Sequence, residues 1–536
     1  MTGEEPRIGA ARRSDSTPRR SLELGSRTAD ALVAASLVLV NLYARWVELE
    51  PIENGGDPLD AWFFVRQWAH ESDFAHATLN HHSTRFGMHW LTWLVQAAFG
   101  THPRYYYVPQ LFASCACVGL VYLLGRQVSG RVTGVVSAAW LMQYDLFHSA
   151  SCQLRRGIFE TMYVLAAVNC LLRFLTATSA RGRQLWLAAC AFCAFLGYLT
   201  ELPALYIAPG VALAIWLARK SPREVMLFAG LLFALFLLET AAYAHFTKYW
   251  GRLAVLVSKH GQIGMVNAAA EPVPFGYLLE RFTNARPPVR FVYFAFFVSG
   301  PVALWRGGPR VRAVALAGCA YVLLQTFVVR SVHPLLVFEK NLDRYLLLGI
   351  PLAIVVSVTM ALAVAGWGLG RLTPALAPGF FRKRRNFAAP SGLVALAVVL
   401  AWLAWDADEH RSEPHPLAEI ERTYRLVNDA LGRGLPLVAW LDQPYFVGER
   451  PRARALHWAV KGFVRDEYWL EGSALPNYTS ARLGILEARY AYVPKRLPEE
   501  RVRELFRRRC VVWLAVDGTW VRAEPRTERL DERCDR

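Results

Sequence analysis

The chain has 536 residues, of which 54% are hydrophobic, 13% are aromatic and only 19% are charged. This composition excludes an ordinary soluble enzyme, whose surface needs more charged side chains. The formal net charge of +17 does not indicate nucleic-acid binding, because short basic loops facing anionic membrane lipids account for it.

Residues 1–28 combine charged residues with Ser, Thr and Pro and show no hydrophobic periodicity, which predicts a disordered tail without a cleavable signal peptide. Apolar windows of bilayer-spanning length then recur as far as Trp405. We therefore predict an all-α polytopic membrane protein whose membrane domain covers residues 29–405. The eleven predicted spans are 29–47, 105–125, 132–150, 157–176, 185–200, 202–218, 224–246, 290–305, 312–329, 343–366 and 387–405.

Basic residues in alternate short loops set the predicted orientation. One side holds Arg126, Arg131, Arg181, Arg183, Arg219, Lys220, Arg223, Arg306, Arg310, Arg312, Arg371, Arg382, Lys383, Arg384 and Arg385. That side is predicted to be cytoplasmic, together with the N-terminus. An odd number of spans then places residues 406–536 on the extracytoplasmic side.

The first outer loop, residues 48–104, is far longer than most connections, and long loops are often functional. Its stretch "DPLDAWFFVRQWAH" predicts a short interfacial helix, and residues 86–100 predict a second one. Asp57 can cap the first helix, with Pro58 at its first position and Asp60 in its first turn. Either carboxylate could instead act as a general base, and the two roles are compatible.

Several cations on the predicted outer side do not follow the positive-inside bias. They are Arg85, Arg155, Arg156, Lys340 and Arg344, with His81 and His82 near the first of them and Tyr345 beside the last. A guanidinium offers paired donors that match phosphate oxygens, so these residues could hold an anion. Alternatively, each side chain extends to lipid headgroups from its helix end.

Four carboxylates fall within apolar stretches, where a charge is costly: Asp145, Glu160, Glu201 and Glu239. The first three lie near the outer ends of their spans and could line a polar cavity. Glu239 lies deeper, where a structural hydrogen bond is at least as reasonable as a functional role. A chain of carboxylates would also suit a proton-driven transporter.

After Trp405 the composition becomes that of a soluble domain. Amphipathic helices alternate with short apolar strands such as "LPLVAWL" and "CVVWLAV", which predicts a small extracytoplasmic α/β domain over residues 406–536. Cys510 and Cys534 lie in this domain and could pair as a disulfide if the compartment is oxidising.

Four stretches together resemble the GT-C superfamily of polytopic glycosyltransferases, particularly the branch of protein O-mannosyltransferases and the lipid A aminoarabinose transferase. They are "GGDPLDAWFFVRQW", "HSTRFGMHWLTWLVQAAFG", "VYLLGRQVSGRVTGVVSAAWL" and "NLDRYLLLGIPLAIVV". The resemblance covers roughly residues 29–370. The second stretch lacks the prolines that are usual in the family.

The resemblance implies inverting transfer of a sugar from a polyprenyl-phosphate donor to a lipid, glycan or protein acceptor, outside a bacterial inner membrane. Asp57 would be the base, with Asp60 as second choice or orienting partner. The leaving phosphate would contact Arg85, Lys340, Arg344, Tyr345 and His82, with Arg155 and Arg156 as further candidates. Glu160 is the nearest candidate for a second outer acidic position that some relatives have. Some relatives use a divalent metal in the first outer loop, and the sequence leaves that open here.

Two other functions stay open: a transporter or flippase for lipid-linked glycans, and a noncatalytic membrane scaffold. A transporter needs access from both sides of the membrane and usually carries internal repeats. The long outer loop with its acidic pair, in a chain where we find no such repeat, favours the enzyme.

Overall fold

The computed structural model describes the larger part of the membrane domain and little beyond it. The described residues are 17–49, 61–62, 64–66, 84–247, 252, 287–327, 329–332, 335–337, 347–372, 417–418, 421, 425, 513–516 and 519–522. Outside them lie the predicted site residues Asp57, Asp60, His82, Lys340, Arg344 and Tyr345, as well as Cys510, Cys534 and the predicted span 387–405.

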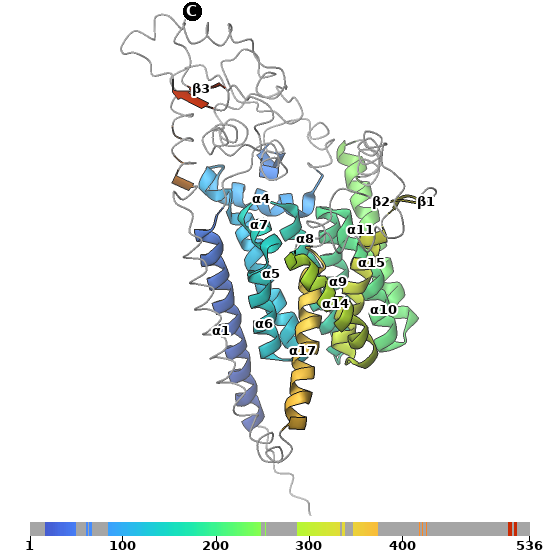
Figure 1. Cartoon of the computed structure of the whole chain (residues 1–536). Coiled ribbons are helices and arrows are strands. Elements are labelled where there is room, and N and C mark those ends of the chain that lie inside the picture. Colours follow the sequence, from blue (N-terminus) through green and yellow to red (C-terminus); the bar gives the residue numbers. More distant parts are fainter. Residues whose placement is uncertain are drawn as a thin grey trace, which may run out of the picture.

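Helices dominate this part of the chain (Figure 1). The longer ones are α1 (Thr17–Val47), α5 (Val108–Ser129), α8 (Arg156–Thr176), α9 (Ala180–Thr200), α11 (Pro222–Thr247), α14 (Pro287–Arg306), α15 (Pro309–Phe327) and α17 (Ile350–Leu372). Shorter ones are α4 (Phe86–Phe99), α6 (Arg131–Met142), α7 (Asp145–Cys152), α10 (Ala208–Arg219) and the 3-10 helices η1 (Pro103–Tyr105) and η2 (Leu202–Ile207).

Within the described residues, six helices are long and apolar enough to cross a membrane. They are Thr28–Val47, Val108–Ser129, Arg156–Thr176, Ala180–Thr200, Leu202–Arg219 and Pro222–Phe246. Large apolar side chains on α11 stay exposed, among them Met226 at 70% and Phe233 at 63%, as lipid-facing positions would be. The chain is a multi-pass membrane protein, while the total of eleven spans remains a prediction.

Two predicted boundaries differ from the structure. Helix α1 begins at Thr17, so residues 17–28, which we predict to be a disordered tail, are helical. This stretch contains three arginines, which favour helix, and it continues directly into the apolar span. The span predicted at 132–150 is two helices, because Tyr144 adopts an extended conformation and Asp145 starts α7 with a carboxylate in its first turn.

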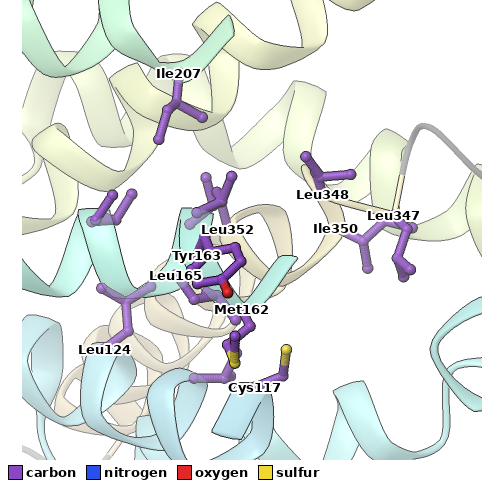
Figure 2. Packing of buried hydrophobic residues seen from close by; sticks show 14 of the residues in the cluster. Cys117, Leu124, Met162, Tyr163, Leu165, Ile207, Leu347, Leu348, Ile350 and Leu352 are labelled. Atoms are coloured by element: carbon purple, nitrogen blue, oxygen red, sulfur yellow. The ribbon is translucent and has the colours of Figure 1, made fainter. Parts of the chain in front are cut away.

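The helices pack around one apolar core that runs from α1 to α17. Figure 2 shows part of it, to which Cys117 of α5, Met162 of α8, Ile207 of η2 and Leu352 of α17 all contribute. Polar side chains also join the helices, since Asn41 of α1 donates to the Ser114 hydroxyl of α5 at 2.9 Å. Such interhelical hydrogen bonds and close packing hold helices together in lipid, where burial from water contributes little.

Four short strands complete the described structure. β1 (Val329–Val332) pairs antiparallel with β2 (Leu335–Val337), and β3 (Trp513–Val516) pairs antiparallel with β4 (Thr519–Arg522). β3 lies within the predicted strand "CVVWLAV". Most of residues 406–536 lie outside the described residues, so the α/β domain remains a prediction.

Candidate functional site

Three helix termini that carry charged residues meet at one end of the helix bundle. Arg85 immediately precedes α4, Arg156 is the first residue of α8, and Glu201 immediately follows α9. At this end the long loops also begin, because α1 finishes at Val47 and α11 finishes at Thr247. Figure 1 shows α4 lying across this end of the bundle. It is the end predicted to face outside.

A buried cluster of two basic and two acidic residues forms at this junction, and we call it the Arg85 cluster: Arg85, Arg156, Glu160 and Glu201. The Glu201 carboxylate lies 2.6 Å from Nε of Arg156 and 4.0 Å from Nε of Arg85. Glu160, one turn after Arg156 on α8, is only 1% exposed and interacts electrostatically with Glu201, Arg156 and Arg85. Residues far apart in the sequence are thus brought together.

The helix dipoles work against each charge of the ion pairs. Arg85 and Arg156 stand at helix N-termini, which favour anions, while Glu201 stands at a C-terminus, which favours cations. Each misplacement costs about 0.3 to 1 kcal/mol, and the ion pairs compensate. Two helix N-termini and two guanidiniums at one place nevertheless produce a region that is favourable for a bound anion.

The charges within the cluster are held next to one another. Glu201 contacts both guanidiniums, and Glu160 interacts electrostatically with Arg156 and Arg85. Guanidiniums fixed in this way offer paired N–H donors that match the oxygens of an anionic group such as a phosphate.

A buried tyrosine lies near the cluster. Tyr321 of α15 interacts electrostatically with Glu160 and Glu201, and its ring centroid lies 6.3 Å from that of the half-buried Tyr206. A Cβ placed on Gly349 would lie 2.9 Å from Cδ1 of Tyr321. The chain entering α17 therefore passes directly beside these tyrosines.

Helix α4 is held close to the bundle, which fixes the position of Arg85. A Cβ on Gly87 would collide with the Leu196 carbonyl and with Thr200, so only glycine permits this approach of α4 to α9. The Tyr163 hydroxyl of α8 donates to the Gly87 carbonyl at 2.7 Å and accepts from Nε1 of Trp90 at 2.7 Å.

Arg252, from the second long loop, fastens the end of α9. Its guanidinium is fully buried and donates to the carbonyls of Tyr198 at 2.6 Å and Thr84 at 3.2 Å. Its Nε also lies 3.2 Å from Glu239 of α11. The Tyr198 carbonyl has no partner within its own helix end, and Arg252 supplies one. The sequence allows Glu239 either a structural or a functional role, and this contact with Arg252 is a structural one.

Sequence reasoning identifies the members of the Arg85 cluster, with Glu201 among the carboxylates that could line a polar cavity, but not how they pair. Arg85, Arg156 and Glu160 are among the predicted residues, and the structure brings them together. Arg155 points to a different partner, donating to Gln153 at 3.3 Å. Arg252 was not predicted, because nothing in the surrounding "YWGRLAVL" distinguishes it from a lipid-facing cation.

A second charged group at the same end was also missed. Arg45 of α1 donates to Glu48 at 2.9 Å, and Nδ1 of His148 on α7 lies 3.0 Å from the same carboxylate. The Arg45 guanidinium also contacts the Met142 carbonyl. An arginine at the predicted outer end of the first span, against the positive-inside bias, was the available signal.

A metal site is not assembled by the part of the chain that the structure describes. Within that part, no group of three His, Cys, Asp or Glu side chains could hold a metal ion. The residues in the loop where a metal would be expected, including Asp57, Asp60 and His82, lie outside it. A divalent metal remains a prediction, and we derive no step through one.

Residues 82–243 match the family model described as dolichyl-phosphate-mannose-protein mannosyltransferase. The predicted family resemblance is confirmed over this segment. It contains every member of the Arg85 cluster. The cluster therefore lies in the segment that matches this family model. A comparison with curated proteins found no match.

Solved structures give weaker similarities. ArnT from Cupriavidus metallidurans bound to undecaprenyl phosphate is 13% identical, with 91% of each chain covered and a TM-score of 0.49. The apo state of that protein is 12% identical, with 92% of each chain covered and a TM-score of 0.47. The Archaeoglobus fulgidus oligosaccharyltransferase is 14% identical, covering 74% of this chain and 55% of its own, with a TM-score of 0.44. These scores are too low to support an argument about this site.

Proposed function

We propose that this chain is an integral membrane glycosyltransferase that moves a sugar from a polyprenyl-phosphate donor to an acceptor on the outer face of the membrane. The observation that carries the proposal is the Arg85 cluster. It is buried, it holds two guanidiniums at helix N-termini, and it lies within the segment that matches a glycosyltransferase family. It also stands at the bundle end where both long loops begin.

The proposed reaction inverts the sugar carbon in one displacement. An acceptor hydroxyl or amine attacks the anomeric carbon, the bond from that carbon to the phosphate oxygen breaks, and polyprenyl phosphate leaves with the bonding electrons. A general base removes the acceptor proton. The leaving phosphate gains negative charge as the bond breaks, and positive groups fixed beside it stabilise that charge.

Arg85 and Arg156 are suited to the leaving phosphate because their positions are fixed before the donor binds. Glu201 orients both guanidiniums. We assign the base to Asp57, which precedes the helical residues 61–62 in the first long loop, with Asp60 as its second candidate or orienting partner. Lys340, Arg344, Tyr345 and His82 remain proposed phosphate contacts, and Gly349, five residues after Arg344, packs beside Tyr321.

One assay identifies the class of acceptor, whether lipid, glycan or protein. The purified full chain in lipid nanodiscs is incubated with radiolabelled polyprenyl-phosphate sugars and extracts of envelope lipids, glycans and proteins. We expect release of free polyprenyl phosphate together with a labelled product in one of the three fractions.

The same preparation separates this function from transport. A transporter or flippase would move intact donor across a proteoliposome membrane and leave its sugar-phosphate bond unbroken. Donor relocation without bond cleavage under any acceptor would therefore refute the proposed enzyme.

A further inference from the structure

A second charged site lies at the opposite end of the bundle from the Arg85 cluster. Residues of five helices line a cavity of about 390 Å³ there: Asp30, Arg126, Gln127, Gly130, Arg131, Arg173, Thr176 and Arg310. Four arginines thus face one aspartate. The cavity falls in the range of about 300 to 1,000 Å³ that is typical of small-molecule sites.

Asp30 organises the first half of this cavity. Arg126 at the end of α5 and Arg131 at the start of α6 both pair with its carboxylate, and the Tyr122 hydroxyl donates to it at 3.3 Å. Gly130, with φ of 111°, makes the turn that presents both arginines to α1, in a conformation that side-chain-bearing residues rarely adopt. The Asp30 carboxylate is therefore already engaged by side chains of α5 and α6.

The other two arginines come from α8 and α15. Arg310 donates to the Gln127 carbonyl at 2.9 Å, which holds its guanidinium at the cavity. Within the described residues, neither Arg173 nor Arg310 forms an ion pair with a carboxylate. Arg173 is not needed to cap α8, because Arg219 donates to the Phe174 and Leu175 carbonyls at the end of that helix.

We propose that this cavity binds a phosphate group, presented by an anionic phospholipid headgroup of the predicted cytoplasmic leaflet or by a small soluble phosphate. Arginine matches phosphate oxygens through paired N–H donors, and lipid headgroups lie at this level of the membrane. The cavity of about 390 Å³ is more than ten times the volume of about 30 Å³ that one water molecule occupies, so it has room for a phosphate group. The positive-inside bias alone would scatter the arginines rather than converge them on one cavity.

The test compares two double variants of the full chain, purified in detergent and stripped of lipid. R173Q/R310Q removes two cavity arginines, both exposed and outside any described carboxylate pair. R181Q/R223Q removes two exposed arginines from the same predicted side that do not line the cavity. Each is titrated with phosphatidylglycerol, phosphatidylcholine and inorganic phosphate, and binding is measured by native mass spectrometry and thermal shift.

We expect the cavity variant to bind phosphatidylglycerol about tenfold more weakly than the matched variant, as loss of charge-assisted hydrogen bonds predicts. Phosphatidylglycerol binding without inorganic phosphate binding assigns the lipid as the source. Competition between the two assigns a site that recognises the phosphate group itself. Equal losses in both double variants, or no saturable binding by the wild type, would overturn the proposal. Unchanged melting temperatures without ligand verify that both variants fold.

Discussion

Nε of Arg156 lies 2.6 Å from the carboxylate of Glu201, joining the first residue of α8 to the residue that follows α9. Because Glu201 also lies 4.0 Å from Arg85, one carboxylate fixes two guanidiniums from different helices. Its loss would leave both positive charges repelling each other in a buried place. The pair therefore links the stability of this end of the bundle to the geometry of the proposed phosphate site.

The first prediction concerns this carboxylate. We expect Glu201→Gln to lower the free energy of unfolding by about 3 kcal/mol, because removing one partner of a buried ion pair leaves the other uncompensated. Thermal unfolding in detergent measures the loss. Glu224→Gln is the matched control, since Glu224 pairs with a half-buried Arg183 at 3.5 Å and should change stability by less than about 1 kcal/mol. Equal effects of the two substitutions would contradict the assigned role of Glu201.

The second prediction concerns Arg252. We expect Arg252→Lys to destabilise the protein by about 2 to 3 kcal/mol. The Tyr198 carbonyl, the Thr84 carbonyl and Glu239 contact three different nitrogens of the planar guanidinium, and the single nitrogen of an ammonium cannot lie within hydrogen-bonding distance of all three. Limited proteolysis should show faster cleavage near α9. Arg219→Lys is the control: that arginine also caps a helix, through the Phe174 carbonyl, but it is only half-buried. If both variants are as stable as the wild type, Arg252 does not hold this end together.

The third prediction tests the close approach of α4 to α9. Gly87→Ala should cost about 1 to 3 kcal/mol, because its Cβ would overlap the Leu196 carbonyl. It should also weaken donor binding by displacing Arg85. Gly230→Ala, on α11 with nothing within 4 Å of its Cβ, should be neutral or slightly stabilising. Calorimetry and donor titration separate the two effects, and a stable, fully active Gly87→Ala would exclude the tight contact.

The fourth prediction concerns the proposed base. Asp57→Asn should reduce the turnover number by about 10² to 10⁴ while donor affinity is kept, as expected when only proton removal is lost. Asp60→Asn should reduce turnover less. Steady-state rates and donor binding of the purified variants provide the measurement. Full turnover by Asp57→Asn would exclude Asp57 as the base.

The fifth prediction concerns the segment before α17. Arg344→Ala should weaken donor affinity about tenfold through loss of a charge-assisted contact to phosphate. Binding of a non-hydrolysable polyprenyl phosphonate measures this directly. Arg290→Ala, at the start of α14, removes an exposed arginine outside the proposed site and serves as control. Unchanged donor affinity in Arg344→Ala would remove that residue from the site.

Helix positions were largely predictable from the sequence because a long apolar window usually forms a membrane-spanning helix. The exceptions have local causes that hydropathy does not register. Tyr144 interrupts one apolar window by adopting an extended backbone, and Thr17 starts α1 in a polar stretch that only helix propensity could have flagged. A hydropathy window averages over such single residues.

The sequence predicted which charged residues belong to the Arg85 cluster, but not which of them pair with one another. Arg85 and Arg156 stood out because cations on the predicted outer side need a reason. Their shared partner Glu201 is distant in the sequence from Arg85 and from Arg156, so only the packing of α4, α8 and α9 brings the three together. Arg252 gave no signal, because its role depends on carbonyl groups whose need for a donor arises only when α9 ends.

Helix α4 also connects the site to the surrounding lipid. It begins one residue after Arg85 and carries exposed Trp90, Trp93 and Phe99, side chains that anchor at the water interface of a bilayer. A rigid helix cannot shift these anchors without shifting its first turn. Because α4 is also fixed to α8 and α9 at Gly87, a bilayer thickness that displaces the tryptophans would strain the helix end next to Arg85, so we expect acyl-chain length in the host membrane to affect turnover.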